Sequence, residues 1–487
     1  MKASQHNVAA ALAIVGLGLH AAITSAASCS TVLTPSYNTP VVASGWTAQI
    51  VANGLHKPRS IQFDSSGSLL VVESGKGVSR IVFTDKGKTC LEVASYTTVV
   101  NDTSLNHGLV LTANETVLLA SSVAAVNAYV YDAKTGSVSG SSQTVVSGMS
   151  NNDLTTRTLL MSTAKDGTLL VSRGSSEDYD EDALNVKSGL SQIRAFDLSS
   201  LTASSSDVSA YDFDTAGLRV GWGLRNSVGM AEHPVTGGIF AVENSIDDAT
   251  REGTDIHENN PGEELNYLGT LSDLSSSKQG SNYGYPNCFA VWNTSIPDNA
   301  GLVVGSQVSM IVNSTYNDTT CADTTVSPRL TFPAHMAPLD IIFTSDGATA
   351  YVTFHGSTDK TAKVGYHLSS LEFNSTTGSP VDDDTSTTAL TTILSNPDLT
   401  QCPGACFRPV GLAWDASGRL FMSSDATGEI YVLLKSSSTA TSTASGTMVT
   451  PTSSAKSAAA PAALFSRTTA LLAVALTGSA TVLLSAF

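Results

Sequence analysis

The stretch VGMAEHPVTGGIFAVENS, from Val228 to Ser245, contains the pattern that decides the fold. A short apolar run is followed by a His-Pro-x-Thr-Gly turn and a second apolar run, and a small polar loop ends the unit. Two apolar runs on either side of a turn signal are typical of a β-hairpin. The unit therefore predicts two paired strands, because no apolar period of helical length runs through it.

The same unit occurs six times along the chain. The copies cover 60–74, 108–122, 158–175, 228–245, 340–357 and 411–425. Outer strands are readable after several of them, at 79–83, 127–132, 191–198, 365–373 and 429–434. Six similar units of this kind predict an all-β chain folded as a six-bladed β-propeller. A pair of β-sandwiches is the alternative, and it leaves the repetition unexplained.

A basic or amide side chain precedes each inner strand of the repeat. These residues are Arg59, His107, Arg157, Arg225 with Asn226, His335 and Arg408. In a propeller the starts of the inner strands meet at one mouth of the central channel, so we expect a cationic funnel that binds a carboxylate-bearing ligand. The alternative is that each basic residue pairs with an acidic residue of a neighbouring blade.

The chain of 487 residues has a formal net charge of −17, which argues against nucleic-acid binding because no basic stripe is available. Residues 1–27 have the pattern of a secretory signal peptide, and 28–435 contain the repeats. A Ser/Thr/Ala-rich stretch at 436–461 predicts a disordered linker, and 462–487 predict a GPI-anchor signal, with a membrane span as the alternative. We therefore expect a secreted protein held at the cell surface or wall by a lipid anchor.

Six cysteines in a secreted chain predict three disulfides, and their order favours Cys29–Cys90, Cys288–Cys321 and Cys402–Cys406. Zinc is the weaker alternative, because no histidine stands at ligand spacing. Six N-glycosylation sequons agree with secretion and indicate surface loops. They begin at Asn101, Asn114, Asn293, Asn313, Asn317 and Asn374.

A polar loop after the fourth repeat carries an unusual number of carboxylates. They are Asp247, Asp248, Asp255, Glu258, Glu263 and Glu264. Carboxylates this close in sequence repel one another unless they are solvated or bound to cations, and Ca²⁺ takes oxygen ligands from such loops. A solvated acidic loop is the alternative.

Four segments of this region resemble one enzyme family. GLRNSVGMAEHP (223–234), ENSIDD (243–248), NNPGEELN (259–266) and NYGYPNC (282–288) are similar to the glucose/sorbosone dehydrogenases, most closely to fungal-type PQQ-dependent pyranose dehydrogenases. The resemblance implies a propeller that binds PQQ and Ca²⁺ and oxidises the C1 hydroxyl of a pyranose or a related keto-aldose. It also implies an external electron acceptor, such as a cytochrome domain.

The resemblance implies a role for several residues. Arg225 and Asn226 match the pair that contacts PQQ and substrate. Backbone carbonyls of the loop that contains Ser245, Ile246, Asp247 and Asp248 are expected to bind the cofactor's Ca²⁺. Positions matching a second, structural Ca²⁺ site are Glu263 and Glu264. Basic positions matching the cofactor funnel are Arg59, Arg157, His335 and Arg408. Lys360, also expected to bind the cofactor, replaces the arginine of the family's His-Gly-Ser-Trp-Asn/Asp-Arg motif.

This sequence departs from the family at the general base, because Leu154 stands where the family has the histidine of His-x-Thr-Arg. Leucine accepts no proton, so we expect His107, or else His355 or Asp153, to replace that base. The alternative is a catalytically impaired propeller that binds a carbohydrate or an anionic ligand. A hydrolase or lactonase is a third reading, which the cationic strand starts disfavour.

Overall fold

The computed structural model describes residues 29–205, 209–275, 280–310 and 316–436. The expected signal peptide at 1–27 lies outside these ranges. The expected linker lies outside them as well apart from its first residue, and so does the expected anchor signal at 462–487. No helix within the described ranges is long and apolar enough to cross a membrane.

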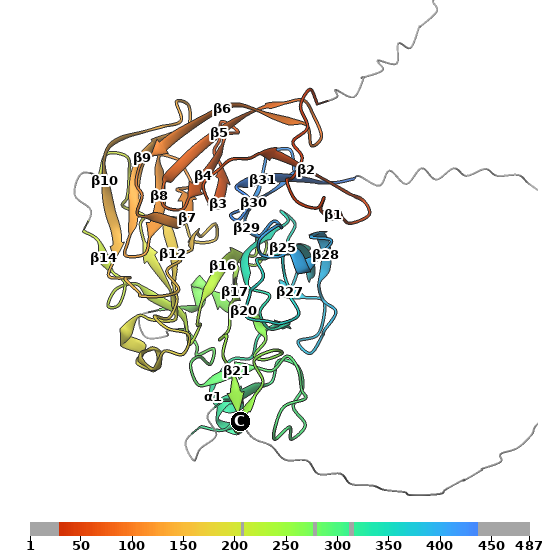
Figure 1. Ribbon diagram of the computed structural model, residues 1–487. Helices are drawn as coiled ribbons and strands as arrows, with labels where there is room; N and C mark the ends of the chain where they lie inside the picture. The colour runs from red at the N-terminus through yellow and green to blue at the C-terminus, as the bar shows by residue number, and fades with distance from the viewer. Residues whose placement is uncertain (1–28, 206–208, 276–279, 311–315, 437–487) are drawn as a thin grey trace, which may run out of the picture. The chain divides into compact units, whose positions relative to one another are not determined.

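Six sheets, each mainly antiparallel, form the blades of the described fold (Figure 1). Blade one contains β3 (Pro58–Phe63), β4 (Leu69–Glu73), β5 (Gly77–Asp85) and β6 (Leu91–Val100). Blade two contains β7 (Leu105–Leu111), β8 (Val117–Ser122), β9 (Val126–Asp132), β10 (Ser137–Ser147) and β14 (Tyr211–Asp212). Blade three contains β11 (Leu159–Met161), β12 (Thr168–Arg173), β13 (Gln192–Asp197) and β15 (Leu218–Trp222).

The second half of the ring follows the same plan. Blade four contains β16 (Ser227–Glu232), β17 (Gly238–Glu243), β20 (Glu263–Thr270) and β23 (Leu330–Phe332). Blade five contains β24 (Pro338–Phe343), β25 (Thr349–Phe354), β26 (His367–Asn374), β27 (Ser379–Pro380), β28 (Thr391–Ser395) and β1 (Val41–Val42). Blade six contains β29 (Pro409–Trp414), β30 (Leu420–Ser424), β31 (Glu429–Lys435) and β2 (Trp46–Ala52).

The inner strands close into a ring. β3 contacts β7, β7 contacts β11, β11 contacts β16, β16 contacts β24, β24 contacts β29, and β29 returns to β3. β2 pairs with β31, with Trp46 opposite Lys435, so the sixth blade joins both ends of the described chain. Figure 1 shows the blue strands β29–β31 beside the red β2. The prediction of a six-bladed β-propeller is confirmed.

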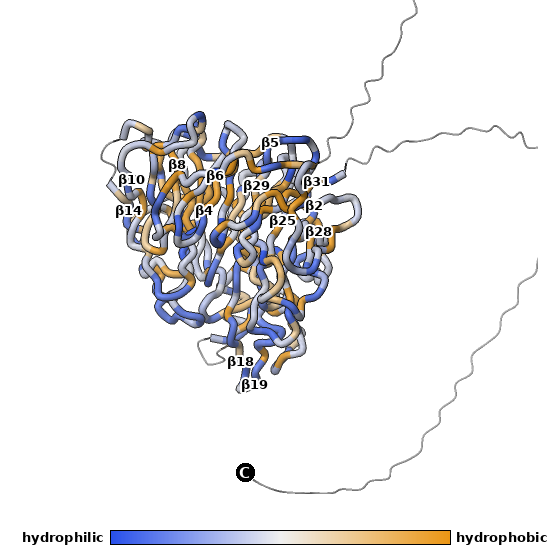
Figure 2. The backbone as a smooth tube through the Cα atoms, turned by 45° about the horizontal axis from the view of Figure 1, so that its top comes forward, coloured by the Kyte–Doolittle hydropathy of each residue, from blue (hydrophilic) through white to orange (hydrophobic). Residues whose placement is uncertain are grey.

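Continuous apolar runs place the second strand of each blade in the interior. Every residue of β4, β8, β12, β17 and β30 is buried, as expected for strands covered on both faces. Hydrophobic clusters join adjacent blades, for example Leu119 of blade two with Leu169 and Phe196 of blade three. Figure 2 shows the strands of the ring largely in hydrophobic colours, while polar residues gather in the loops.

Two glycines allow the inner strands to approach closely at the start of the channel. A Cβ atom on Gly108 would lie 2.3 Å from the carbonyl oxygen of Arg157, and one on Gly411 would lie 2.5 Å from that of Arg59. Both distances are shorter than atoms tolerate. The glycines therefore fix the backbone from which two of the expected basic residues project.

Segments between the strands of the ring carry further short elements, most of them after the hairpins of blades three and four. They contain β18 (Thr250–Arg251), β19 (Thr254–Asp255), β21 (Cys288–Ala290), β22 (Gln307–Ser309), α1 (Asp318–Thr324) and four short 3-10 helices. The 3-10 helices are η1 (Glu181–Leu184), η2 (Val186–Ser188), η3 (Leu271–Asp273) and η4 (Leu399–Gln401). The three expected disulfides are confirmed as Cys29–Cys90, Cys288–Cys321 and Cys402–Cys406.

The channel also contains a cavity of about 490 Å³, which is lined by residues from all six inner strands. Its lining residues, such as Phe63, Met161 and Phe343, come later along these strands than the basic residues at their starts. The cavity therefore lies toward the other end of the channel.

Candidate functional site at the channel mouth

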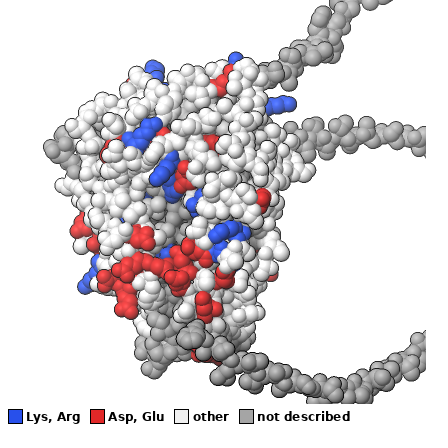
Figure 3. Space-filling model, in the orientation of Figure 1, with Lys and Arg blue, Asp and Glu red and all other residues white. Residues whose placement is uncertain are grey.

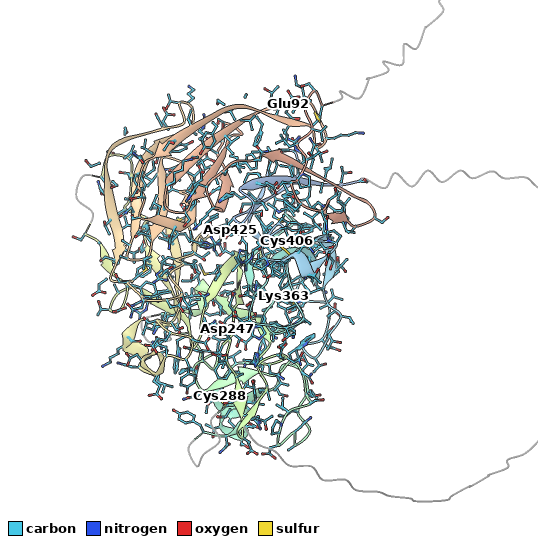
Figure 4. The ribbon with its side chains drawn as sticks, viewed as in Figure 1. Glu92, Asp247, Cys288, Lys363, Cys406 and Asp425 are labelled. Atoms are coloured by element: carbon cyan, nitrogen blue, oxygen red, sulfur yellow. A yellow bond between two sulfur atoms is a disulfide. The ribbon has the colours of Figure 1, made fainter. Side chains whose placement is uncertain are left out.

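The side chains at the starts of the inner strands form two clusters at one mouth of the channel. One is built around Asp425, which follows β30, and the other around Asp247, which follows β17. Figure 4 labels Asp425 near the middle of the ring and Asp247 below it, on the side of blade four. Figure 3 shows a band of acidic residues on this face with Lys and Arg side chains beside it.

The Asp425 cluster joins blades one, five and six. Arg59 Nη1 lies 2.6 Å from Asp425 Oδ2, and His355 Nε2 lies 2.9 Å from Asp425 Oδ1. Arg408 donates from Nε to the carbonyl oxygen of His355 at 3.1 Å, and its guanidinium lies over the ring of Tyr366. Burial raises the pKa of Asp425, but His355 and Arg59 outweigh burial and hold the pKa below its ordinary value. The carboxylate is therefore ionised.

His107 extends this cluster into the channel. Its Nδ1 atom accepts a hydrogen bond from Arg59 Nε at 3.2 Å, and the backbone of Val228 in blade four engages the ring as well. Burial, together with Arg59, keeps the pKa of His107 well below its ordinary value. The ring is buried and held on both sides, so this geometry does not support the expected role of His107 as a general base.

The Asp247 cluster joins blade four to its neighbours. Arg225 Nη2 lies 2.5 Å from Asp178 Oδ1 and 3.3 Å from Asp247 Oδ2. His335 Nδ1 lies 3.6 Å from Asp247 Oδ1, and its Nε2 atom lies 2.7 Å from the carbonyl oxygen of His257. Burial lowers the pKa of His335, but Asp247, the carbonyl oxygen of His257 and the charge of Glu263 together outweigh burial and raise the pKa above its ordinary value. Arg225 and His335 therefore face one carboxylate from two blades.

Asp178 is a member of the site that the strand-start pattern does not identify. It belongs to the insertion after β12, and its carboxylate accepts hydrogen bonds from the backbone amides of Asp247 and Asp248 as well as from Arg225. The only sequence signal is the acidic run at 177–182, which interrupts the regular spacing of the repeats. Asp178 thus fixes Arg225 next to the loop 244–248, which is expected to bind Ca²⁺.

Backbone carbonyl oxygens of the loop from Asn244 to Asp248 accept hydrogen bonds from the guanidinium of Arg225. Arg225 donates from Nη1 to the carbonyl oxygen of Ser245 and, at 3.4 Å, to that of Asn244. Ile246 is buried and anchors the loop in an apolar cluster. Carbonyl oxygens of this kind suit a hard cation, so the loop has the donor atoms that Ca²⁺ requires.

Glu263 lies beneath the same loop. Its carboxylate accepts hydrogen bonds from the backbone amides of Ser245 at 2.8 Å and Ala337 at 3.1 Å. Burial raises its pKa to about 7 despite these two bonds. Glu263 therefore connects the loop 244–248 of blade four to the start of blade five.

Glu264 belongs to a different feature, a row of polar side chains that crosses blade four from strand to strand. Ser227 lies opposite Glu243, Glu243 opposite Glu264, and Glu264 opposite Thr331. Residues directly opposite one another project on the same face of a sheet. These four residues, which we call the polar row, are all less than 6% exposed.

The polar row brings two carboxylates together, and in the described part of the chain an amide rather than a basic side chain bridges them. Asn266 Nδ2 donates to Glu243 Oε2 at 3.0 Å and to Glu264 Oε2 at 2.9 Å. Within the described residues, the buried Asn266 Oδ1, Ser227 Oγ and Thr331 Oγ1 atoms have no hydrogen-bond partner. Burial raises the pKa of Glu264 to about 7, and burial with the charge of Glu264 raises that of Glu243 well above its ordinary value. The row therefore requires protons or a cation.

Two expected cofactor residues have other partners. Arg157 is fully buried and donates to the carbonyl oxygens of Val123, Leu154, Thr156 and Met149. Burial lowers its pKa to about 9. Lys360 donates to the carbonyl oxygen of Glu258 and to Asn259 Oδ1. Both side chains stabilise loops around the mouth, and their arrangement does not support direct contact with a ligand.

Leu154 lies beside Arg225 and Asn226, the pair that the resemblance places at PQQ and substrate. A Cβ atom on Gly174 would lie 3.0 Å from both Leu154 Cβ and Asn226 Oδ1, and 3.1 Å from the carbonyl oxygen of Arg225. Leu154 has a left-handed backbone with φ of 43°, and its amide donates to Asp153 Oδ1. An apolar side chain thus occupies the region where the resemblance implies a base.

The sequence left open the alternative that each basic residue pairs with an acidic residue of a neighbouring blade. Some of the basic residues at the mouth do so. Arg59, Arg225 and His335 have such partners, whereas Arg157, Lys360 and Arg408 are held mainly by backbone oxygens. In the described part of the chain, no group of three or more His, Cys, Asp or Glu side chains is arranged to hold a metal ion. A cation at this mouth must therefore use backbone, amide or hydroxyl oxygens as well.

The fold and the site can be compared with known proteins. A family model described as TrAA12-like matches residues 40–436. The chain is 49% identical over 416 residues to a pyrroloquinoline quinone-dependent sugar dehydrogenase of Hypocrea jecorina, covering 85% of this chain and 93% of the relative. It is 34% identical to a pyrroloquinoline quinone-dependent pyranose dehydrogenase of Coprinopsis cinerea, covering 84% of this chain and 56% of that longer relative.

Solved structures agree with these similarities. The calcium structure of a Trichoderma reesei protein of Carbohydrate-Active Enzymes Family AA12 superposes with a TM-score of 0.80 at 50% identity, covering 84% of this chain and all of that one. The holo form of the pyranose dehydrogenase PQQ domain of Coprinopsis cinerea gives a TM-score of 0.77 at 33% identity, covering 83% of this chain and 99% of that domain.

Proposed function

Because the chain belongs to the TrAA12-like family, we propose that it is a PQQ-dependent sugar dehydrogenase that oxidises a pyranose or a keto-aldose. The observation that carries this proposal is the gathering of Arg59, Arg408, Arg225 and His335 at one mouth of the channel. A quinone with three carboxylates needs several cations within one small space, and arginine binds a carboxylate through two parallel hydrogen bonds.

The arginines of the mouth can exchange a carboxylate of the protein for a carboxylate of PQQ. Asp425 holds Arg59, and Asp178 holds Arg225, through contacts that an incoming carboxylate can replace. Arg408 keeps its position through backbone oxygens, and no carboxylate among the described residues forms an ion pair with it. When bound, PQQ supplies a quinone that accepts hydride from the sugar, and Ca²⁺ beside it strengthens that acceptor. Arg225 and Asn226 would orient the sugar hydroxyl.

The test is reconstitution of the metal-free protein with PQQ and Ca²⁺. We expect PQQ absorbance to remain after desalting and aldoses to reduce an artificial dye. Arg59→Gln should weaken PQQ retention, whereas Arg419→Gln should leave it unchanged. Arg419 is a matched control because it is also buried and paired, with Asp415 and Asp85 away from the mouth. Failure of wild-type protein to retain PQQ contradicts the proposal.

The position of Leu154 favours a second candidate function, a propeller that binds PQQ or a sugar with little turnover. Leucine cannot remove the hydroxyl proton, and the expected substitute His107 is held on both sides. Loss of a general base costs roughly 10²- to 10⁴-fold in rate. Leu154→His should therefore increase sugar-dependent dye reduction at least tenfold while PQQ retention stays constant. No increase means that another group, such as His355 or Asp153, takes the proton.

Two calcium sites complete the proposal. The carbonyl oxygens of the loop 244–248, now held by Arg225, suit the cofactor's Ca²⁺. The unpartnered oxygens around the polar row, together with Glu243 and Glu264, suit a structural cation buried in blade four. Glu263, which holds the loop through Ser245, supports the first site rather than the second. Chelator should lower the melting temperature of wild-type protein, and Glu264→Gln should reduce that difference.

The proposed partners follow from the same chemistry. Electrons from the sugar must pass to an external acceptor, for which a cytochrome domain is the family's counterpart. Three disulfides support an oxidising location outside the cell. Attachment to the cell surface through a GPI anchor rests on residues 462–487 of the sequence alone.

A further inference from the structure

A second cavity, of about 260 Å³, lies beside the mouth between the loops 254–260 and 293–297. Most of its lining residues are polar, among them Asp255, His257, Glu258 and Asn259. His257 Nδ1 lies 2.6 Å from Asp255 Oδ1, so these two side chains support each other. The proposed cofactor site does not use this pocket.

Asn293 forms part of the pocket wall and begins the sequon Asn293-Thr294-Ser295. The buried side chain of Asn260 holds the backbone there. It accepts hydrogen bonds from the amides of Trp292 at 2.8 Å and Asn293 at 3.1 Å and donates to the carbonyl oxygen of Asn293 at 2.9 Å. Asn293 Oδ1 accepts from the amide of Ser295, and this leaves the side-chain nitrogen as the group that can be modified.

Another sequon offers a contrast. Asn374 ends β26 and is exposed, and its Oδ1 atom accepts from the amides of Thr376 and Thr377 much as Asn293 does from Ser295. Asn374 is absent from the lining of the polar pocket. The two asparagines therefore share a local turn but differ in their surroundings.

We propose that Asn293 carries an N-linked glycan whose first N-acetylglucosamine lies in this pocket. The Asn293 nitrogen attacks C1 of an oligosaccharide linked to a lipid diphosphate. The N–C1 bond forms, the C1–O bond to phosphate breaks, and the lipid diphosphate and one proton leave. Sugar hydroxyls donate to carboxylates and accept from imidazole, which are the groups that Asp255, Glu258 and His257 provide.

A sugar in this pocket would brace one side of the channel mouth. The segment 254–260 that forms the pocket wall also receives His335, at the carbonyl oxygen of His257, and Lys360, at the carbonyl oxygen of Glu258. The glycan would therefore restrain the backbone that holds two basic residues of the mouth. This inference does not depend on PQQ binding.

The experiment compares two glycans within one protein. The full chain is secreted from a yeast that adds high-mannose glycans, and endoglycosidase H release at each sequon is followed by peptide mass spectrometry. We expect Asn293 to be modified and its glycan to be released at least tenfold more slowly than that of Asn374 in folded protein. After denaturation the two rates should be equal.

A variant tests the pocket itself. In the double variant Asp255→Ala/His257→Ala, release at Asn293 should accelerate toward the rate at Asn374, while release at Asn374 stays unchanged. An unmodified Asn293 in the secreted wild-type protein overturns the proposal. Equal native release at both positions overturns it as well, and neither of these two results depends on how the variant folds.

Discussion

Asp340 provides a test of the electrostatics of the channel far from the proposed cofactor site. This residue of β24 lines the large cavity, and its carboxylate accepts hydrogen bonds from the amides of Ile341 at 2.8 Å and Leu412 at 2.7 Å. Burial raises the pKa of Asp340 from 3.8 to about 7, despite these two bonds. The folded protein therefore keeps a proton here that the unfolded chain releases.

The sign and size of the effect follow from this pKa. A carboxyl group with a raised pKa adds stability below its unfolded pKa and loses that stability as the pH rises through its folded pKa. One pKa unit corresponds to about 1.4 kcal/mol, so Asp340 loses about 3 kcal/mol of stabilisation between pH 5 and pH 8. Asp340 is only partly buried and lines the cavity, so solvent screening lowers this figure and a loss of about 1 to 3 kcal/mol is expected.

Asp340→Asn removes the titration. The free energy of unfolding of both proteins should be measured by urea denaturation at pH 5 and pH 8. Comparing the two proteins isolates Asp340, because all other groups titrate equally in both. We subtract the free energy of unfolding of wild type from that of the variant at each pH. This difference should be about 1 to 3 kcal/mol more positive at pH 8 than at pH 5. At pH 5 the variant should be the less stable protein, because an amide cannot accept both backbone hydrogen bonds. A difference between wild type and variant that is the same at both pH values, within about 0.5 kcal/mol, would refute the reasoning.

Three further changes test the packing that supports the mouth. Asp425→Asn should lower the free energy of unfolding by about 2 to 4 kcal/mol, because Arg59 and His355 lose a largely buried partner; an unchanged denaturation midpoint would contradict the ion-pair geometry. Gly411→Ala should cost about 1 to 3 kcal/mol, since its Cβ would meet the Arg59 carbonyl oxygen, whereas Gly404→Ala has no such contact and serves as the control. Replacing Cys288 and Cys321 by serine should lower the free energy of unfolding by about 3 to 4 kcal/mol, because the disulfide closes a loop of 33 residues. The variant is compared with wild-type protein in buffer without reductant.

The fold was predictable because the repeat is strong at the level of sequence. Each hairpin of the ring joins two apolar runs across a turn signal, as between Val228 and Ser245, and the basic residues before these hairpins lie at corresponding places in the ring. The disulfides followed from their order in the chain. The role of β2 was not foreseen, because nothing in Trp46–Ala52 shows that it pairs with β31 at the other end of the chain.

The side-chain partners could be predicted only in part. Local sequence places Arg59 and Arg157 at equivalent positions, yet Arg59 faces Asp425 while Arg157 donates to backbone carbonyl oxygens. Which of these occurs depends on residues distant in the chain. Asp178 reaches Arg225 from an insertion outside the repeated hairpins, so no periodic pattern could indicate it.

The pairing of β2 with β31 has a consequence for the order of assembly during synthesis. Trp46–Ala52 leaves the ribosome early, but its partner strand ends at Lys435, the last residue of the described strands. For most of translation this early strand has no neighbour to complete its hydrogen bonds, and the edges of the first blades stay open to unwanted pairing. The nascent chain should therefore depend most on chaperones just before its final hairpin emerges.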